Sequence, residues 1–212
     1  MNTPIITDAD LNELSPYTRN LFLKWRRYMY ECVEFNMPDS KIHAWNHCER
    51  VLLFALRLGE KIFGDDEDSL EPLAHAAIFH DTRREDDYLD TGHGARAAVY
   101  YTNFCKQHSD IIHHDITSYL MRYHDLDDEL GIQNIRENFC KNKKTALTQY
   151  AIFKDADALD RYRLGSFGLN PKFLRTNEAH SMTDYAENLV KRTVMPELLA
   201  DIDAKVRRVL GK

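Results

Sequence analysis

Apolar side chains recur at helical spacing along almost the whole chain, and this periodicity restricts the fold to an all-helical one. In residues 16–36, for example, Leu21, Phe22, Trp25 and Met29 fall on one face of a predicted helix. No stretch alternates apolar and polar residues with enrichment in β-branched side chains, so no strand is expected. We therefore predict an all-α fold, a bundle of about seven to nine helices.

The length of 212 residues suits one globular domain, and contents of 43% hydrophobic and 29% charged residues are ordinary for such a domain. We expect a single all-α domain over residues 1–212. The N-terminal helix at 16–36 and C-terminal helices at 178–210 are expected to pack on its core.

The formal net charge of −6 and the lack of a basic face or tail argue against stable nucleic-acid binding. No apolar run approaches the ~18 residues that a membrane-spanning helix requires. Residues 1–10 are acidic and lack the apolar region of a signal peptide. The scattered cysteines are predicted to be reduced thiols, so a cytoplasmic location is expected. They are Cys32, Cys48, Cys105 and Cys140.

An apolar helical run from Ala74 to Phe79 leads directly into the pair His80 and Asp81. Adjacent residues within a helix point about 100° apart, but at a helix end the backbone can turn. An imidazole and a carboxylate can then reach one cation together. Such ligands suit divalent Mn, Fe, Co, Ni, Zn or Mg.

Two further polar residues lie in surroundings that suggest a metal site. His47 comes early in the second predicted helix, and His43, four residues earlier, could share its face. Asp157 lies in an otherwise apolar helix, where burying a carboxylate is costly unless it is paired or binds a metal. Asp155 is the closest alternative to Asp157. Together with Asp160, these residues span little more than one helical turn.

These residues, taken together, resemble the HD-domain superfamily of metal-dependent phosphohydrolases, as a small standalone member. The motifs are His-x-x-Arg-Val from His47, the Ala-rich run into His80-Asp81, and Asp-Ala-Asp-x-Leu-Asp at 155–160. The resemblance implies an HD-domain-like helical bundle with its core at about 42–164. It also implies that His47, His80, Asp81 and Asp157 bind a divalent metal ion.

Two more histidines are candidate ligands. Some HD families bind a second metal through histidines at the positions of His93 and His124, so one or two ions per chain are expected. The alternative is that His93 caps a helix and His124 interacts with a helix dipole. The remaining histidines are expected to be structural or exposed; they are His75, His108, His113, His114 and His180.

The resemblance implies hydrolysis of a nucleotide or other small phosphoester by metal-activated water. Asp81 is the candidate that holds the metal and orients the water, with Glu85 or His93 as proton-transfer groups. Arginine suits phosphate through its planar, bidentate guanidinium. The candidate substrate-binding residues are Arg50, Arg84 and Arg161.

Two other functions fit the same residues. An HD-type di-iron oxygenase would require both His93 and His124 as ligands, and a non-catalytic HD module would bind a nucleotide without turnover. Hydrolases of guanosine tetraphosphate carry a Glu-Asp pair after their His-Asp pair, one residue closer than Glu85-Asp86 lies here. This spacing does not favour that substrate. The Gly-Tyr-Pro signature of cyclic-di-GMP phosphodiesterases does not follow His124. The expected partner is a small molecule, and homo-oligomer formation is left open.

Overall fold

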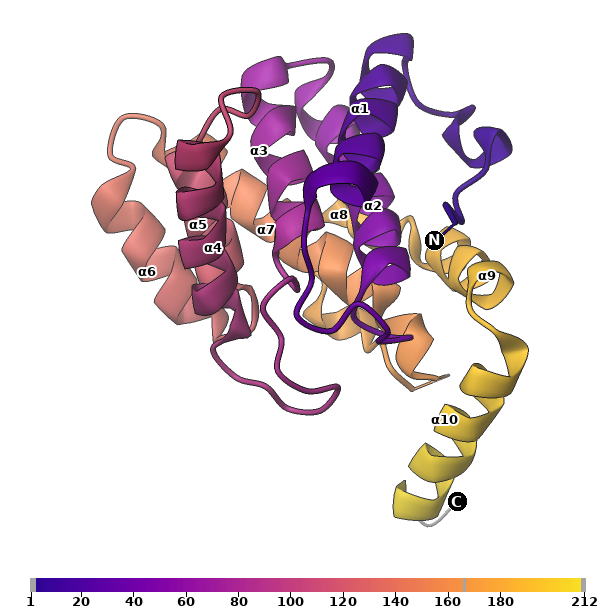
Figure 1. The fold of residues 1–212 in the computed structure, drawn as a ribbon. Helices are drawn as coiled ribbons and strands as arrows, with labels where there is room; N and C mark the ends of the chain where they lie inside the picture. The colour runs from indigo at the N-terminus through magenta and orange to yellow at the C-terminus, as the bar shows by residue number, and fades with distance from the viewer. Residues whose placement is uncertain (1–2, 166, 211–212) are drawn as a thin grey trace.

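Ten α-helices and three short 3-10 helices make up the secondary structure of residues 3–165 and 167–210, which the computed structural model describes (Figure 1). These residues contain no strand, so the predicted all-α fold is confirmed. The α-helices are α1 (Pro16–Cys32), α2 (Trp45–Phe63), α3 (Glu67–Phe79), α4 (His93–Gln107), α5 (Asp115–His124), α6 (Asp128–Asn138), α7 (Lys143–Leu159), α8 (Asn177–His180), α9 (Thr183–Thr193) and α10 (Pro196–Leu210). The 3-10 helices are η1 (Asp8–Leu11), η2 (Asp160–Leu164) and η3 (Pro171–Phe173).

The helix count exceeds the predicted seven to nine because the C-terminal segment divides into three helices. The helix α9 packs on η2, whereas Figure 1 shows α10 extending away from the bundle. Residues 1–2, 166 and 211–212 of the predicted domain lie outside the described part of the chain. Among the described helices, none has both the length and the apolar character needed to cross a membrane.

Helices α2 and α3 form the centre of the bundle. Residues 69–79 of α3 are buried on every side, and so are residues 47–59 of α2. A helix that is buried around its whole circumference lies in the core of the domain rather than at its surface. Helices α1, α5 and α7 pack around α3, and so does α4. The end of α3, where His80 follows Phe79, therefore lies inside the protein.

The helix that carries Asp157 ends before it reaches Asp160. The α-helix α7 ends at Leu159, and the chain continues as the 3-10 helix η2. A 3-10 helix has three residues per turn, so the side chains of η2 point in different directions from those of a continued α-helix. Asp157 and Asp160 lie beside different nitrogens of the His47 imidazole, Nε2 and Nδ1 respectively.

Lys154 of α7 closes the C-terminal end of α5. Its Nζ donates to the backbone oxygens of His124 (2.9 Å) and Leu126 (2.7 Å), and lies 2.9 Å from Asp128 Oδ1. The last carbonyls of a helix lack partners within the helix, and a cation there is favourable. Lys154 therefore holds the helix end that carries His124.

Gly94 allows α4 and α5 to approach closely, and this gives a test of the fold. A Cβ atom at Gly94 would lie 2.2 Å from the Met121 carbonyl oxygen and 2.7 Å from His124 Nδ1. Gly94→Ala should therefore lower the free energy of unfolding by about 1–3 kcal/mol, as overpacking does. Urea denaturation measures the change. Val99→Ala on the exposed face of α4 is the control and should change the stability little; equal effects of the two substitutions would contradict the packing.

Candidate metal centre

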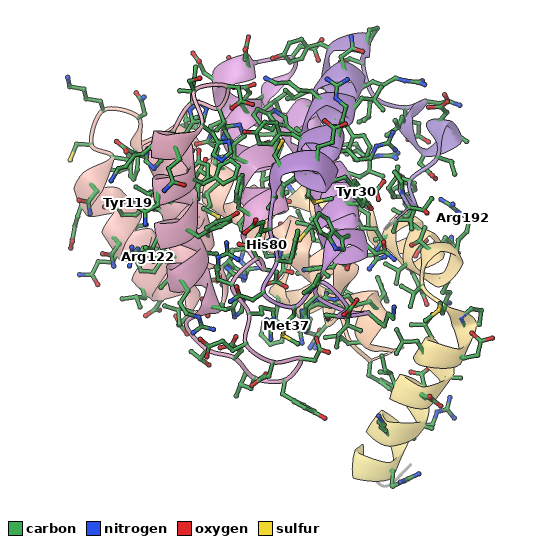
Figure 2. All side chains as sticks on the ribbon, in the orientation of Figure 1. Tyr30, Met37, His80, Tyr119, Arg122 and Arg192 are labelled. Atoms are coloured by element: carbon green, nitrogen blue, oxygen red, sulfur yellow. The ribbon has the colours of Figure 1, made fainter. Side chains whose placement is uncertain are left out.

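The pair His80 and Asp81 lies at the buried C-terminal end of α3. His80 continues the helical conformation, and its N–H donates to the Ala76 carbonyl. Its imidazole Nδ1 donates to the Ala77 carbonyl oxygen at 3.0 Å, which leaves Nε2 as the free nitrogen. In Figure 2 His80 lies near the middle of the molecule, whereas Arg192 lies at its edge. Asp81 is 4% exposed, so the pair faces the interior.

His47 of α2 and Asp157 of α7 converge on His80. The two imidazole nitrogens His47 Nε2 and His80 Nε2 are 3.0 Å apart, and Asp157 Oδ1 lies 3.4 Å from His47 Nε2. Each of these three residues offers one ligand atom, and the three atoms lie within 4.8 Å of one another. Three helices that are far apart in the sequence thus bring one possible ligand each.

His93 and His124 belong to the same cluster. His93 Nε2 is 2.9 Å from His124 Nε2 and 3.0 Å from Asp81 Oδ1. The Nδ1 atoms donate to the carbonyls of Asp90 (2.5 Å) and Met121 (2.7 Å). His80, His93 and His124 thus all bond the carbonyl three residues earlier, so one local arrangement orients three rings.

The tautomers of these rings follow from their Nδ1 partners. The Nδ1 atom of His47 lies 2.7 Å from Asp160 Oδ2, so a carboxylate accepts its proton; in the other three rings a carbonyl does. A neutral imidazole has one N–H, so in the neutral form of each of the four rings Nε2 carries a lone pair. His47 Nε2 then faces His80 Nε2 at 3.0 Å, and His93 Nε2 faces His124 Nε2 at 2.9 Å, with a lone pair on each nitrogen. A shared cation relieves this repulsion, and the residues present therefore fit a metal ion.

The carboxylate of Asp81 faces both pairs of histidines. Its Oδ2 lies 3.1 Å from His43 Nδ1 and 3.4 Å from His47 Nε2. Its Oδ1 lies on the side of His93 and His124 and is buried without a hydrogen bond. One carboxylate with an oxygen on each side is suited to bridge two cations.

The protonation states of His47, His80 and Asp81 at neutral pH suit a metal. Burial lowers the pKa of His47, and it lowers the pKa of His80 to about 3, so both rings are neutral. Burial by itself would raise the pKa of Asp81, but the surrounding imidazoles, His80 first, hold it well below its usual value. Burial would lower the pKa of His124, but Asp81 and then Asp157 raise it. Neutral imidazole and ionised carboxylate are the forms that bind divalent ions.

Arg50 supports the cluster from behind and does not line the cavity, which corrects its predicted role in substrate binding. It is 1% exposed, and its Nε and Nη2 donate to Asp160 Oδ1 (2.5 Å) and Oδ2 (3.0 Å). Burial would raise the pKa of Asp160, but Arg50 and then His47 lower it to about 2. The Arg50–Asp160 pair therefore fixes the orientation of His47.

The structure also places Glu85 outside the cluster, contrary to its predicted role in proton transfer. Its side chain is exposed and lies 3.6 Å from Arg96 Nε, and its backbone N–H donates to Asp90 Oδ2 at 2.8 Å. The loop after Asp81 turns at this residue, so its carboxylate faces solvent. The sequence distance from the His-Asp pair did not show this turn.

Asp155, the alternative to Asp157, has a structural role on another face of α7. Its carboxylate accepts hydrogen bonds from the backbone N–H of Arg175 at 2.9 Å and of Thr176 at 2.8 Å. It therefore holds the segment before α8 against α7. Because Asp155 and Asp157 are two residues apart, helix geometry turns them to different sides.

A cavity of about 450 Å³ opens over the cluster. Its volume suits a small molecule. Its lining includes Asp81, His93, His124 and Asp157 from the cluster, and also His43, Arg84, Arg161 and Arg163. Arg84 and Arg161 were predicted to bind substrate, and both line the cavity.

His43, Arg163 and Asp160 belong to this region although none was assigned a site role from the sequence. His43 precedes the first residue of α2, so helical spacing from His47 did not predict its position. Arg163 Nε donates to the Ile42 carbonyl oxygen at 2.7 Å, a contact between distant segments that only the tertiary structure creates. The sequence offered one indication of a site role for Asp160, namely that it is the third aspartate of residues 155–160.

No family model, curated protein or solved structure matches the chain. The buried His/Asp cluster can bind a metal ion and is consistent with an HD-like site. Membership of the HD superfamily stays a prediction.

Asp160→Asn tests the support of His47. The amide cannot accept both the His47 and the Arg50 bonds as the carboxylate does, so metal affinity should fall about 10–100-fold. Isothermal titration calorimetry with Mn²⁺ or Zn²⁺ measures it. Asp155→Asn is the matched control, since it also alters a fully buried aspartate near the end of α7. A similar loss of affinity in both variants would contradict the role of Asp160.

The metal-free protein should lose stability as the pH falls from about 6.5 to about 3. The pKa of His80 is lowered from 6.5 to about 3, so in this window the unfolded chain binds a proton that the folded chain does not. Urea unfolding in EDTA at about pH 7.5 and 5 measures the dependence, in a range where most carboxylates stay ionised. The dependence should be shallower in His80→Asn. An unchanged pH dependence in that variant would refute the argument.

Proposed function

We propose that the protein is a metal-dependent phosphohydrolase that acts on a nucleotide or another small phosphoester. The observation that supports this most is the pairing of unprotonated imidazole nitrogens around the Asp81 carboxylate, at the floor of a cavity whose walls carry arginines. A divalent ion for the floor and guanidinium groups for a phosphate are the two requirements of such a reaction.

The ligands divide into two groups on the two sides of Asp81. His47, His80 and Asp157, with Asp81 Oδ2, would hold one ion. His93 and His124, with Asp81 Oδ1, would hold a second. A bound ion lowers the pKa of a water molecule from about 16 toward 7 and polarises a phosphoryl oxygen. Mn, Fe, Co, Ni, Zn or Mg fits this donor set.

Three arginines are placed to bind the phosphate. Arg84 and Arg163 are buried at the cavity wall, and Arg163 Nη1 is a buried donor without a hydrogen-bond partner. Arg161 is exposed, and its Nε donates to the Gly168 carbonyl at 2.8 Å. A phosphate oxygen would provide an acceptor for these groups, and each charge-assisted bond would fix the orientation of the substrate.

His43 replaces Glu85 as our candidate for proton transfer. Its Nδ1 lies 3.1 Å from Asp81 Oδ2, so Nε2 is the free basic nitrogen when Nδ1 donates to that carboxylate. Burial lowers its pKa, so the ring is neutral at pH 7 and able to accept a proton. It lines the cavity, where it can reach a water molecule beside a substrate.

A di-iron oxygenase is the second candidate function. The inclusion of both His93 and His124 in the cluster favours it, because that function requires two occupied sites. Oxygen consumption with two irons per chain would support the oxygenase, and phosphate release without oxygen would support the hydrolase.

Variants of one histidine and one arginine test the proposed hydrolase through the rate of phosphate release and KM. Protein loaded with each divalent ion in turn should release phosphate from a nucleotide or a general phosphoester, and His80→Ala should reduce this at least about 100-fold. Arg161→Ala should raise KM about 10-fold with a smaller effect on kcat, since it removes binding without altering the metal ligands. Steady-state phosphate release measures both.

The control for this experiment is Arg136→Ala, which removes an exposed arginine on α6 that does not line the cavity. Its KM should equal that of the unaltered protein. Absence of hydrolysis with every ion, or equal rates for His80→Ala and the unaltered protein, would overturn the proposed function.

A further inference from the structure

A second group of possible metal ligands lies beside the middle of α3, on the N-terminal side of His80. Glu71 and His75 are one helical turn apart on α3, and His114 precedes the first residue of α5. Each of the three offers one ligand atom, and these atoms lie within 4.8 Å of one another. Along the α3 axis this group lies on the order of 10 Å from His80, so it is separate from the candidate metal centre.

Two imidazole nitrogens in this group are buried without a partner. His75 is completely buried; its Nδ1 lies 2.9 Å from the Tyr101 hydroxyl, and its Nε2 has no hydrogen bond. His114 Nε2 is likewise buried and unpartnered, and it lies 3.7 Å from Glu71 Oε2, beyond hydrogen-bond distance. Buried polar atoms in native proteins normally have partners, so two unpartnered nitrogens beside one carboxylate indicate a missing ligand.

We propose that Glu71, His75 and His114 form a second, peripheral site for a divalent metal ion of the zinc type. A tetrahedral zinc ion with bonds of about 2.0–2.1 Å holds its ligand atoms roughly 3.4 Å apart. The 3.7 Å between Glu71 Oε2 and His114 Nε2 is close to this separation, so small side-chain movements complete the site. Two histidines and one glutamate leave the fourth position for water.

The charge around Glu71 is compatible with a cation. The His114 imidazole, and then Lys24, lower the pKa of Glu71 to about 2, so its carboxylate is ionised at neutral pH. Lys24 Nζ binds only the other oxygen, Oε1, at 2.7 Å, and the lysine side chain is 51% exposed. Oε2 therefore stays available to the metal.

A cavity of about 560 Å³ gives the ion a path from solvent. His114 forms part of its wall, and Asp66, Asp68 and Asp115 also line it. These carboxylates raise the local concentration of cations at the entrance. A bound ion would join α3 to the start of α5, the two helices that end at His80 and His124.

Trp25 provides a probe at this site. Its ring packs edge-on against His75 with centroids 4.0 Å apart, and Trp45 is the only other tryptophan of the chain. In the Trp45→Phe protein, Co²⁺ should quench Trp25 fluorescence in a saturable titration, and excess Zn²⁺ should reverse the quenching. Added Glu71→Gln or His114→Asn should weaken Co²⁺ binding at least 10-fold. Added His113→Asn, which removes the neighbouring ring stacked on Tyr101, should leave it unchanged.

A measurement on the unaltered protein keeps the proposal testable if a variant fails to fold. In long-range ¹H–¹⁵N spectra, Zn²⁺ should shift the imidazole nitrogens of His75 and His114 and leave those of His113 in place. Zn²⁺ that shifts neither His75 nor His114, or quenching by Co²⁺ that is unaffected in both folded ligand variants, would overturn the proposal. Neither readout depends on hydrolysis.

Discussion

The hydrogen bonds at the Nδ1 atoms of four buried imidazoles determine the geometry of the candidate metal centre. Three backbone carbonyls and the Asp160 carboxylate accept these protons, so the Nε2 lone pairs of His47, His80, His93 and His124 turn toward Asp81. Burial keeps the His80 ring neutral, and the pKa of Asp81 is held low. The result is an arrangement of donors that a cation would stabilise.

Helix ends supply most of this arrangement. The carbonyls of Ala77 and Met121 lie in the last turns of α3 and α5, where helix geometry leaves acceptors without partners. A histidine three residues later donates to such a carbonyl. The same hydrogen bond therefore gives the carbonyl a partner and orients the imidazole. Lys154 gives another carbonyl at the end of α5 a partner, because its Nζ donates to the His124 carbonyl oxygen. The stability of the bundle and the geometry of the centre therefore depend on the same groups.

Local sequence patterns and long-range contacts determine different parts of this structure. Apolar periodicity was sufficient for the all-α fold, because helical spacing is a property of neighbouring residues. The roles of Arg50 and Glu85 were not predicted correctly: one is buried against Asp160 and the other faces solvent in a loop. Arg50 lies close to His47 in the sequence, and Glu85 lies close to His80 and Asp81. That distance does not determine direction where a loop turns or a helix changes its winding.

The sequence by itself determined the helices, the buried end of α3 and the residue types able to bind a metal, because local spacing and side-chain chemistry express these directly. Only the tertiary structure decided which oxygen and nitrogen atoms meet. The packing of α2, α3, α4, α5 and α7 turned Asp157 toward His47 and Asp155 away from it, and brought His75 beside His114. These contacts join segments far apart in the chain, and their geometry depends on helix packing, which no local pattern encodes.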